Sequence, residues 1–249
     1  MKEYIAHIET LAANALVATT RTSFDGWRLR YNGGVTRRAN SVLAESSGTL
    51  PLAEKIAHAE DWYKALGARA RFQLCPASQP ESLMAELLQR NYSRHSGAKI
   101  QVGKIEKILA NPSKDLELSL SPQPSEAWLE LYEITEKAPP EKAHIRRQMF
   151  ELLEPKTAFA LAKIKGQNAA VGLGVYEADY VGIFNMATLP EMRKQGAASA
   201  LLRKLAQWGH NQGASQLYLQ VATENYGAQQ VYEKLGFSTL YEYDYFEAP

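Results

Sequence analysis

The chain has 249 residues, of which 45% are hydrophobic and 22% charged, as in an ordinary globular protein of one or two domains. Its formal net charge of +1 gives no overall field that would recruit nucleic acid or an acidic membrane. The single cysteine, Cys75, excludes an internal disulfide, and no apolar run is long enough to cross a bilayer. We therefore expect a cytoplasmic protein, monomer or homodimer, with no nucleic-acid or membrane partner. The five histidines lie far apart, so no metal site is expected.

The first half of the chain alternates helical and strand patterns. Residues 2–18 place their apolar side chains on one helical stripe. Two strands are predicted at 26–31 and 35–43, joined by a hairpin turn at Asn32-Gly33-Gly34. Further expected elements are helices at 51–66 and 80–90 and strands at 70–75 and 96–102. Residues 104–114 have the pattern of a connector, which predicts two domains, 1–108 and 109–249.

The second half of the chain begins with an alternating strand at 116–120. Two helices are expected at 126–136 and 141–153, separated by Pro139-Pro140. Three strands at 157–165, 169–177 and 180–188 are joined by loops short enough to predict an antiparallel meander. The remaining predicted elements are a helix from Gly196 to near Gly213, a strand at 216–221, a helix at 225–235 and a strand at 237–246.

The residues between the third meander strand and the next helix are unusual for a helix start. Arg193, Lys194 and Gln195 stand directly before Gly196, although a helix N-terminus favours acidic side chains over cations. An anion in this turn would reverse that preference, because free N–H groups and the two cations could bind it together. Gly196 followed by Ala197-Ala198 leaves room for such a ligand. The alternative is a solvated turn that happens to carry basic residues.

Two motifs resemble those of one family. Arg193-x-x-Gly196-x-Ala198 resembles the pyrophosphate loop of the GNAT superfamily of acyl-CoA N-acyltransferases. Downstream, the residues from Asn225 to Phe237 resemble the GNAT signature Asn-x-x-Ala-x-x-x-Tyr-x-x-x-Gly-Phe. The two stand at the separation that the family shows, and the order of predicted elements in the second half matches the GNAT fold. In that fold, the strand at 180–188 and the parallel strand at 216–221 splay apart below a bulge.

This resemblance implies that acetyl-CoA is the acyl donor and that no metal takes part. Tyr232 would protonate the departing thiolate. Met186, Ala187 and Thr188 would offer backbone groups to pantetheine and to the thioester oxygen. The coenzyme-binding residues that it implies are Met186, Ala187, Thr188, Arg193, Lys194, Gln195, Gly196, Ala197, Ala198 and Asn225. For Tyr232, a half-buried aromatic with its hydroxyl in water is the alternative interpretation.

The general base is not evident. Many GNAT members carry Glu or Asp on the strand before the pyrophosphate loop, but residues 181–188 contain no carboxylate, and Asn185 could only position a water. A water relay, or an amine that arrives deprotonated, would need no carboxylate. Four acidic residues are candidates by their element alone: Glu177, Asp179, Glu224 and Asp244.

The first half resembles a faded copy of the second. The helix, strand, helix and strand around Gly67–Tyr92 and Gly213–Phe237 recur in the same order. The position that matches Tyr232 lies near Leu87, and residues 46–52 contain no Arg-x-x-Gly-x-Ala. We therefore predict an α/β (α+β) tandem GNAT fold with a mixed, mostly antiparallel sheet, a complete C-terminal lobe and a degenerate N-terminal lobe. The segment from Trp27 to Val42 also resembles a bacterial group of two-lobed GNAT proteins.

The expected activity is transfer of an acetyl group from acetyl-CoA to a primary amine of a small molecule or peptide by direct attack. A non-catalytic acyl-CoA-binding or regulatory module is the alternative, because fold does not fix function. A weaker alternative is RNA binding through arginines between Arg21 and Arg38, for which strand alternation favours the interpretation as a solvated face. Arg38 and Asn40 could wall the acceptor pocket, or the first lobe could be a scaffold only.

Overall fold

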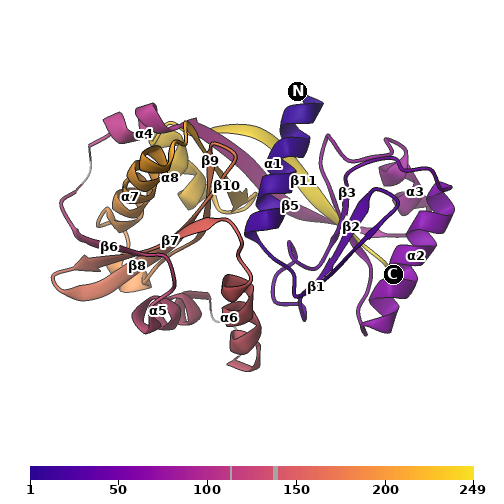
Figure 1. Ribbon diagram of the computed structural model, residues 1–249, viewed down its shortest axis with the longest axis horizontal. Coiled ribbons are helices and arrows are strands. Elements are labelled where there is room, and N and C mark those ends of the chain that lie inside the picture. Colours follow the sequence, from indigo (N-terminus) through magenta and orange to yellow (C-terminus); the bar gives the residue numbers. More distant parts are fainter. Residues whose placement is uncertain (113, 137–139) are drawn as a thin grey trace. The chain divides into compact units, whose positions relative to one another are not determined.

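The computed structural model describes residues 1–112, 114–136 and 140–249 (Figure 1). Contacts divide the chain into two compact units, unit 1 with Met1–Lys99 and Tyr241–Pro249, and unit 2 with Ile100–Leu240. The division falls within strand β5 (Ser93–Lys104), whereas the expected boundary after residue 108 falls inside helix α4 (Ile105–Ala110). Strand β11 (Ser238–Glu247) likewise begins in unit 2 and ends in unit 1.

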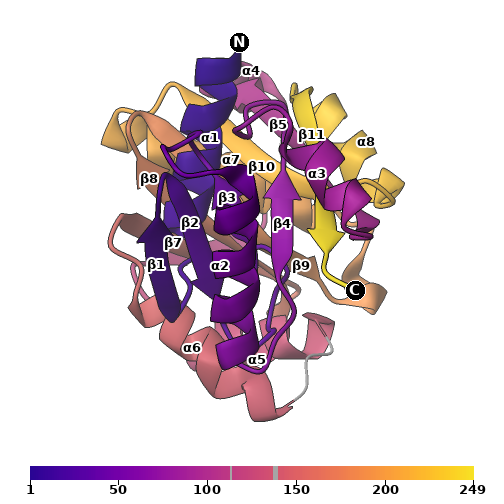
Figure 2. The same cartoon turned by 90° about the vertical axis from the view of Figure 1, so that its right-hand side faces the viewer.

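Unit 1 is a sheet between helices, with strand order β1-β2-β3-β4-β11. Neighbouring strands are antiparallel except for the parallel pair β3 and β4. Helix α1 covers one face of the sheet, and α2 and α3 cover the other (Figures 1 and 2). The other elements of unit 1 are α1 (Lys2–Ala15), β1 (Thr20–Phe24), β2 (Trp27–Tyr31), β3 (Val42–Ala44), α2 (Leu52–Ala65), β4 (Arg71–Leu74) and α3 (Leu83–Gln89).

Aromatic side chains fill the core of unit 1 between the sheet and α2. Trp27 packs edge-on against Phe72 with ring centroids 5.5 Å apart, and Phe72 contacts Tyr92 at 5.8 Å. Such edge-to-face pairs add stability beyond the area that they bury. Leu87, which matches Tyr232 in the proposed duplication, is buried in this core.

The first hairpin turn lies at Asp25-Gly26, before the strand that was expected to precede it. β1 and β2 pair across Asp25-Gly26, whose φ angles of 42° and 80° suit a two-residue turn. The expected turn at Asn32-Gly33-Gly34 instead begins a loop that Asn40 holds, since its Oδ1 accepts bonds from the N–H groups of Asn32 (2.7 Å) and Gly34 (3.0 Å). The strand predicted at 35–43 therefore shrinks to β3. Because these bonds occupy the buried Asn40 side chain, it fastens a loop rather than facing an acceptor.

The arginines of β2 do not form the solvated face that alternation predicts. Arg30 is only 4% exposed, and its guanidinium donates to the carbonyl oxygen (3.2 Å) and hydroxyl (3.0 Å) of Ser41. Arg28 forms an ion pair with Glu45 at 2.7 Å. The prediction failed for Arg30 because β2 is covered on both faces, where period-two alternation no longer separates inside from outside.

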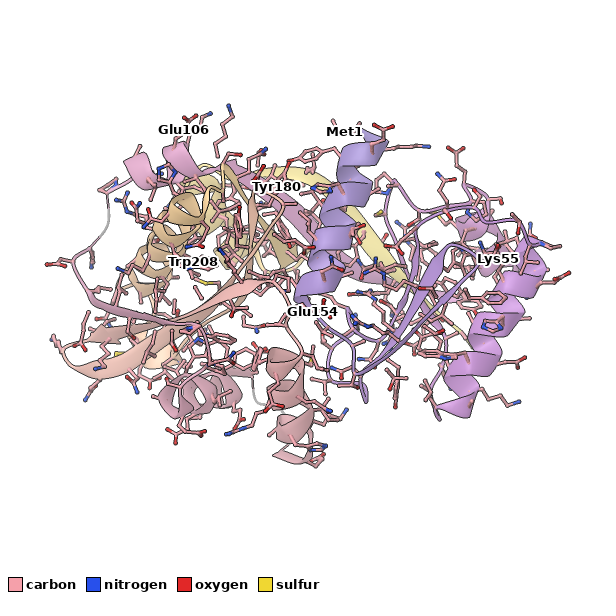
Figure 3. All side chains as sticks on the ribbon, viewed as in Figure 1. Met1, Lys55, Glu106, Glu154, Tyr180 and Trp208 are labelled. Carbon is pink, nitrogen blue, oxygen red and sulfur yellow. The ribbon has the colours of Figure 1, made fainter. Side chains whose placement is uncertain are left out.

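A carboxylate occupies the loop at the start of α2. Asp25 accepts hydrogen bonds from the backbone N–H groups of Thr49 (2.9 and 3.0 Å) and Leu50 (3.0 Å). The buried Lys55 ammonium, labelled in Figure 3, lies 3.2 Å from Asp25 Oδ2 and donates to the Asp25 carbonyl oxygen at 2.7 Å. The two backbone donors, followed by Lys55 and the Thr49 hydroxyl, lower the pKa of Asp25 to about 2. Unit 1 thus holds an anion with backbone N–H groups and one lysine.

Unit 2 has strand order β5-β10-β9-β8-β7-β6, in which β7 to β9 form the predicted antiparallel meander. β6 adds to it as an antiparallel neighbour of β7, and β10 is parallel to β9. Helices α7 and α8 lie on one face of the sheet and α5 and α6 on the other (Figure 1). The mixed, mostly antiparallel tandem fold is confirmed. The expected connector at 104–114 contains α4, and Pro139 lies outside the described residues. The elements are α4, β6 (Glu117–Ser121), α5 (Glu126–Glu136), a 3-10 turn (Pro140–Lys142), α6 (Ala143–Glu151), β7 (Lys156–Ile164), β8 (Gln167–Glu177), β9 (Tyr180–Thr188), a 3-10 turn (Pro190–Met192), α7 (Ala197–Gln212), β10 (Gln216–Ala222) and α8 (Tyr226–Lys234).

Helix α7 approaches the unit 2 sheet closely because glycines face it. A Cβ added to Gly174 of β8 would lie 3.0 Å from Leu205 Cδ2 and 3.3 Å from Trp208 Cζ3. Trp208 is labelled on α7 in Figure 3. The buried side of α7 carries Ala197, Ala200, Leu201, Leu202, Leu205, Ala206 and Gly209. This packing fixes where the N-terminus of α7 ends up relative to β9.

Neither a membrane span nor a metal cluster emerges from the described ranges. Among residues 1–112, 114–136 and 140–249, no helix is long and apolar enough to cross a bilayer. The same residues contain no group of three or more His, Cys, Asp or Glu side chains arranged to hold a metal ion.

Burial raises the pKa of the Cys75 thiol to about 11, so little of it is present as the nucleophilic thiolate at neutral pH.

We expect Asp25→Asn to destabilise the protein in a pH-dependent way. The lowered pKa of Asp25 means that its stabilising contribution is present above its ordinary value of 3.8 and is lost as pH falls through about 2. The difference in unfolding free energy between wild type and D25N, from urea titrations, should therefore shrink between pH 4 and pH 2. Asp61→Asn, at an exposed position of α2, is the control. A D25N difference that is constant over this range would contradict the assignment.

Candidate functional site

The parallel pair in unit 2 separates halfway along β9. Its ladder comprises four pairs, from Tyr180–Gln216 to Ile183–Leu219, although β9 continues to Thr188 and β10 to Ala222. The predicted splay is therefore present. The edge of β9 from residue 184 onward is left without a partner from β10, so its backbone groups on that side can accept an extended ligand.

A bulge in β9 lies at this separation. Leu173 faces Phe184 and Val171 faces Ala187, so Asn185 and Met186 together stand opposite Gly172. Asn185 has a φ of 51°, which belongs to the left-handed region that asparagine tolerates better than most residues. The expected pantetheine-binding residues Met186, Ala187 and Thr188 follow directly.

Asn185 is held from the opposite helix layer. Its Oδ1 accepts a hydrogen bond from the hydroxyl of Tyr132 on α5 at 3.2 Å. Trp128, one helical turn earlier, donates its indole N–H to the carbonyl oxygen of Gly172 at 3.2 Å. The Arg146 guanidinium of α6 lies 5.6 Å from the centre of the Tyr132 ring. Sequence reasoning missed Tyr132, because nothing near it in the chain marks it as facing the bulge.

The loop before α7 has the geometry of an anion site. Lys194 (φ 60°) and Gly196 (φ 93°) both adopt left-handed backbone conformations, and Gly196 is the N-cap of α7. No side chain caps this helix start, and its first turn contains no acidic residue. Arg193 and Lys194 are exposed beside it, and Arg193 Nε lies 3.4 Å from the Thr188 carbonyl oxygen, which it donates to. The helix dipole and two cations thus act in the same direction on an incoming anion.

The corresponding place in unit 1 is already closed. Its parallel pair β3 and β4 also separates after two pairs, but there the N–H of Gln79 donates to the Ala44 carbonyl oxygen at 2.9 Å. The loop at the start of its following helix, α2, holds the Asp25 carboxylate. Unit 1 therefore fills with its own chain what unit 2 leaves accessible.

A lysine outside both motifs lies over the loop of unit 2. A Cβ added to Gly196 would lie 3.0 Å from Lys114 Cδ and 3.4 Å from its Cγ, so the Lys114 stem crosses the start of α7. Lys114 is exposed and precedes β6. Sequence reasoning placed it in a connector, and no signal along the chain could link it to a glycine in another motif.

The connector that carries Lys114 is fastened to two helices. Arg203 of α7 donates to the carbonyl oxygens of Leu109 and Asn111. The Asn111 amide in turn donates to the carbonyl oxygen of Leu235, after α8, at 3.2 Å. These bonds anchor the connector up to Asn111, three residues before Lys114.

The second motif forms the start and core of α8. Asn225 is the N-cap, and its Oδ1 accepts a hydrogen bond from the Ala228 N–H at 3.2 Å. Tyr232 is 9% exposed and packs against Phe237 with ring centroids 5.9 Å apart. Asn225 thus has a structural role whether or not it contacts a ligand. The Tyr232 ring belongs to the unit 2 core, and the alternative of a half-buried ring is not what the structure shows.

The acidic residues considered as bases do not converge on the bulge. Asp244 lies in unit 1, where Arg94 donates to it at 2.5 and 2.8 Å. Asp179 is exposed in the turn before β9, and Glu224 is exposed before α8. Glu177 ends β8 opposite Tyr180, five residues before Asn185 along β9. The Tyr132–Asn185 pair lies at the bulge itself and could orient a water.

Comparison with known proteins agrees with this geometry. Residues 3–246 match the family described as "Probable histone acetyltransferase Rv0428c C-terminal". The chain is 31% identical over 243 residues to the "Uncharacterized N-acetyltransferase YobR" of Bacillus subtilis, covering 97% of each chain. Its fold is similar to that of a GCN5-related N-acetyltransferase from Kribbella flavida, with a TM-score of 0.72, 16% identity, and coverage of 98% and 95% of the two chains. A tandem GNAT protein from the clavulanic acid biosynthesis pathway has a TM-score of 0.64, 15% identity, and coverage of 79% and 70%.

We expect Arg203→Met to lower the free energy of unfolding by about 1–3 kcal/mol, because two carbonyl oxygens of the connector lose their donor. Urea unfolding measures this loss. Lys204→Met, at the exposed neighbouring position on α7, removes the same charge and should change stability by less than about 0.5 kcal/mol. Equal effects of the two substitutions would show that the connector bonds contribute nothing.

Proposed function

We propose that this chain, which belongs to the family described as "Probable histone acetyltransferase Rv0428c C-terminal" within the GNAT superfamily of acyltransferases, transfers an acetyl group from acetyl-CoA to a primary amine. The observation that carries the proposal is the uncapped, acid-free start of α7 beside the unpaired edge of β9. The exposed edge of β9 and the anion site at the start of α7 follow each other along the chain. Together they suit a ligand that has phosphates at one end and an extended amide chain at the other.

The coenzyme would lie along these two features. Its pyrophosphate would accept hydrogen bonds from the first N–H groups of α7 at Ala197 and Ala198, with Arg193 and Lys194 supplying charge. Gln195 and Gly196 would shape the turn. Pantetheine would bond the backbone of β9 from Met186 to Thr188, as a peptide does in strand addition. Asn225, exposed at the start of α8, would meet the pantetheine from the other side of the splay.

The reaction would be direct attack of a neutral amine on the thioester carbon. The C–N bond forms, the carbonyl oxygen becomes negative, and a backbone N–H of β9 near Met186 stabilises it. The C–S bond then breaks, and Tyr232 gives its proton to the departing thiolate. The amine loses its surplus proton to water, which the Tyr132–Asn185 pair would position, since β9 offers no carboxylate beside the bulge.

The acceptor would be an amine of a small molecule or a peptide. The family description names a histone acetyltransferase, so lysine-containing peptides belong among the candidate substrates. The second candidate function is a non-catalytic acyl-CoA-binding or regulatory module. The absence of a carboxylate at residues 181–188 favours it, because many active family members have a base on this strand.

The experiment that tests the proposal has two parts. Calorimetric titration with acetyl-CoA measures binding, and release of free thiol across a panel of amino acids, polyamines, aminoglycosides and lysine peptides measures turnover. Binding with amine-dependent thiol release supports the enzyme. Binding without release by any amine supports the binding module, and absence of binding rejects both.

Tyr232→Phe should lower turnover about 10²–10⁴-fold with little change in acetyl-CoA affinity, because the ring that packs on Phe237 stays while the proton donor is lost. Thiol release and calorimetry measure the two quantities. Tyr226→Phe, on the same helix but 69% exposed, should leave turnover unchanged. Full activity in Y232F would remove Tyr232 from the mechanism.

Ala198→Glu should raise the dissociation constant for acetyl-CoA by about tenfold or more, because a carboxylate would then compete for the N–H groups at the start of α7. The same carboxylate suits the helix dipole, so thermal stability should be unchanged or slightly higher. Ala198→Gln has the same size without the charge and should weaken binding less. If A198E and A198Q have the same dissociation constant for acetyl-CoA, the loop does not bind the pyrophosphate.

A further inference from the structure

We propose that Lys114 binds the coenzyme pyrophosphate, as a residue contributed by the connector and belonging to neither GNAT motif. This inference rests on the proposed function and adds a binding residue to that site. Its ammonium would join Arg193 and Lys194 around the start of α7.

The first support is the position of the Lys114 stem. Its Cδ, Cγ and Cε lie 3.0, 3.4 and 3.6 Å from where a Cβ of Gly196 would be. A side chain at position 196 would therefore make the lysine stem shift by a few tenths of an ångström. Gly196 has two requirements at once, a left-handed φ of 93° and free space for this stem. Because all three methylene carbons pass within 4 Å of that point, the ammonium at the end of the stem stays close to the start of α7.

The second support is that the chain before Lys114 is anchored to the helices of the site. Arg203 bonds the carbonyl oxygens of Leu109 and Asn111 from α7, and Asn111 bonds the Leu235 carbonyl oxygen beside α8. Both helices carry a GNAT motif at their N-termini. The connector is thus anchored up to Asn111, three residues before Lys114, which limits how far Lys114 can move from the start of α7.

The third support comes from unit 1, which shows how this chain binds an anion at the equivalent place. There the Asp25 carboxylate receives two backbone N–H groups, from Thr49 and Leu50, and the Lys55 ammonium 3.2 Å away. In unit 2, α7 has Ala200 at the position that Lys55 occupies in α2, the fourth residue of the helix. In unit 2 the helix therefore supplies no lysine at its fourth position, and Lys114 supplies one from the connector.

The pyrophosphate, rather than the 3′-phosphate of the coenzyme, is the group that this geometry assigns to Lys114. The stem passes over Gly196, the N-cap, where the N–H groups of the first turn converge. Phosphate oxygens held there would be within reach of an ammonium on a short, pre-positioned stem. A charge-assisted contact of this kind is stronger than a neutral one and is screened by salt when it is exposed.

The test compares Lys114→Met, which keeps the stem length and removes the charge, with Lys114→Arg, which keeps a positive charge. Calorimetric titrations at low salt use CoA, dephospho-CoA and pantetheine. We expect K114M to raise the dissociation constants for CoA and dephospho-CoA equally, by about five- to tenfold. Pantetheine, which has no phosphate, should bind both proteins alike. K114R should retain most of the affinity, and the K114M effect should shrink as salt is added.

The control is Lys107→Met, which removes the same charge from an exposed position of α4 and should leave all three affinities unchanged. Wild-type affinity in K114M would overturn the inference, as would tighter binding, which would mean that the stem obstructs the site. An effect on CoA but not on dephospho-CoA would place Lys114 at the 3′-phosphate and overturn the pyrophosphate assignment. If the wild type binds none of the three ligands, the proposed function itself fails, and the inference fails with it.

Discussion

In each unit a strand leads through a loop into a helix, whose N-terminus carries a partial positive charge. The two units differ in whether a carboxylate of the chain itself occupies that loop. In unit 1 the loop before α2 is neutralised internally, since Asp25 accepts N–H bonds there and Lys55 completes the cluster. In unit 2 the start of α7 has neither an acidic residue nor a side-chain cap. The same arrangement of strand, loop and helix thus gives one unit that binds its own carboxylate and one whose helix N-terminus is suited to bind an anionic ligand.

A strand that loses its parallel neighbour provides the second half of the site. The bulge at Asn185 and Met186 turns the backbone of β9 away from β10, and Tyr132 holds the bulge from α5. The end of β9 and the start of α7 are joined by only Leu189, the 3-10 turn Pro190–Met192 and four loop residues, Arg193 to Gly196. The distance between the bulge and the N-terminus of α7 is therefore limited by a short segment of chain. α7 itself packs against the sheet. In the family to which the chain belongs, this is where an acyl-CoA would be expected.

The last strand of the chain, β11, contributes to the sheet and the core of unit 1. β11 begins in unit 2 but pairs with β4 of unit 1, from Asp244–Leu74 to Glu247–Arg71. Tyr241, Tyr243 and Tyr245 of this strand end are buried in unit 1, where the Tyr241 hydroxyl donates to the buried Glu9 at 2.6 Å. Burial, more than any other cause, raises the pKa of Glu9 above its ordinary value. Unit 1 thus depends for its core on the C-terminal end of the chain.

The sequence by itself determined most of the order of helices and strands, which follows from periodicity and turn residues in contiguous stretches, although β1 and α4 were not predicted. The tandem fold was expected because two motifs of the second half resemble those of the GNAT superfamily and the first half repeats its order of elements. It did not determine that Asn40 would fasten a loop, that Arg30 would be buried, or that the hairpin would form at Asp25-Gly26. Only the tertiary structure brought Tyr132 to Asn185, Asp25 to Thr49 and Lys114 to Gly196. Each of these contacts joins residues far apart along the chain, and their meeting depends on how the helices pack on the sheet, which no local pattern records.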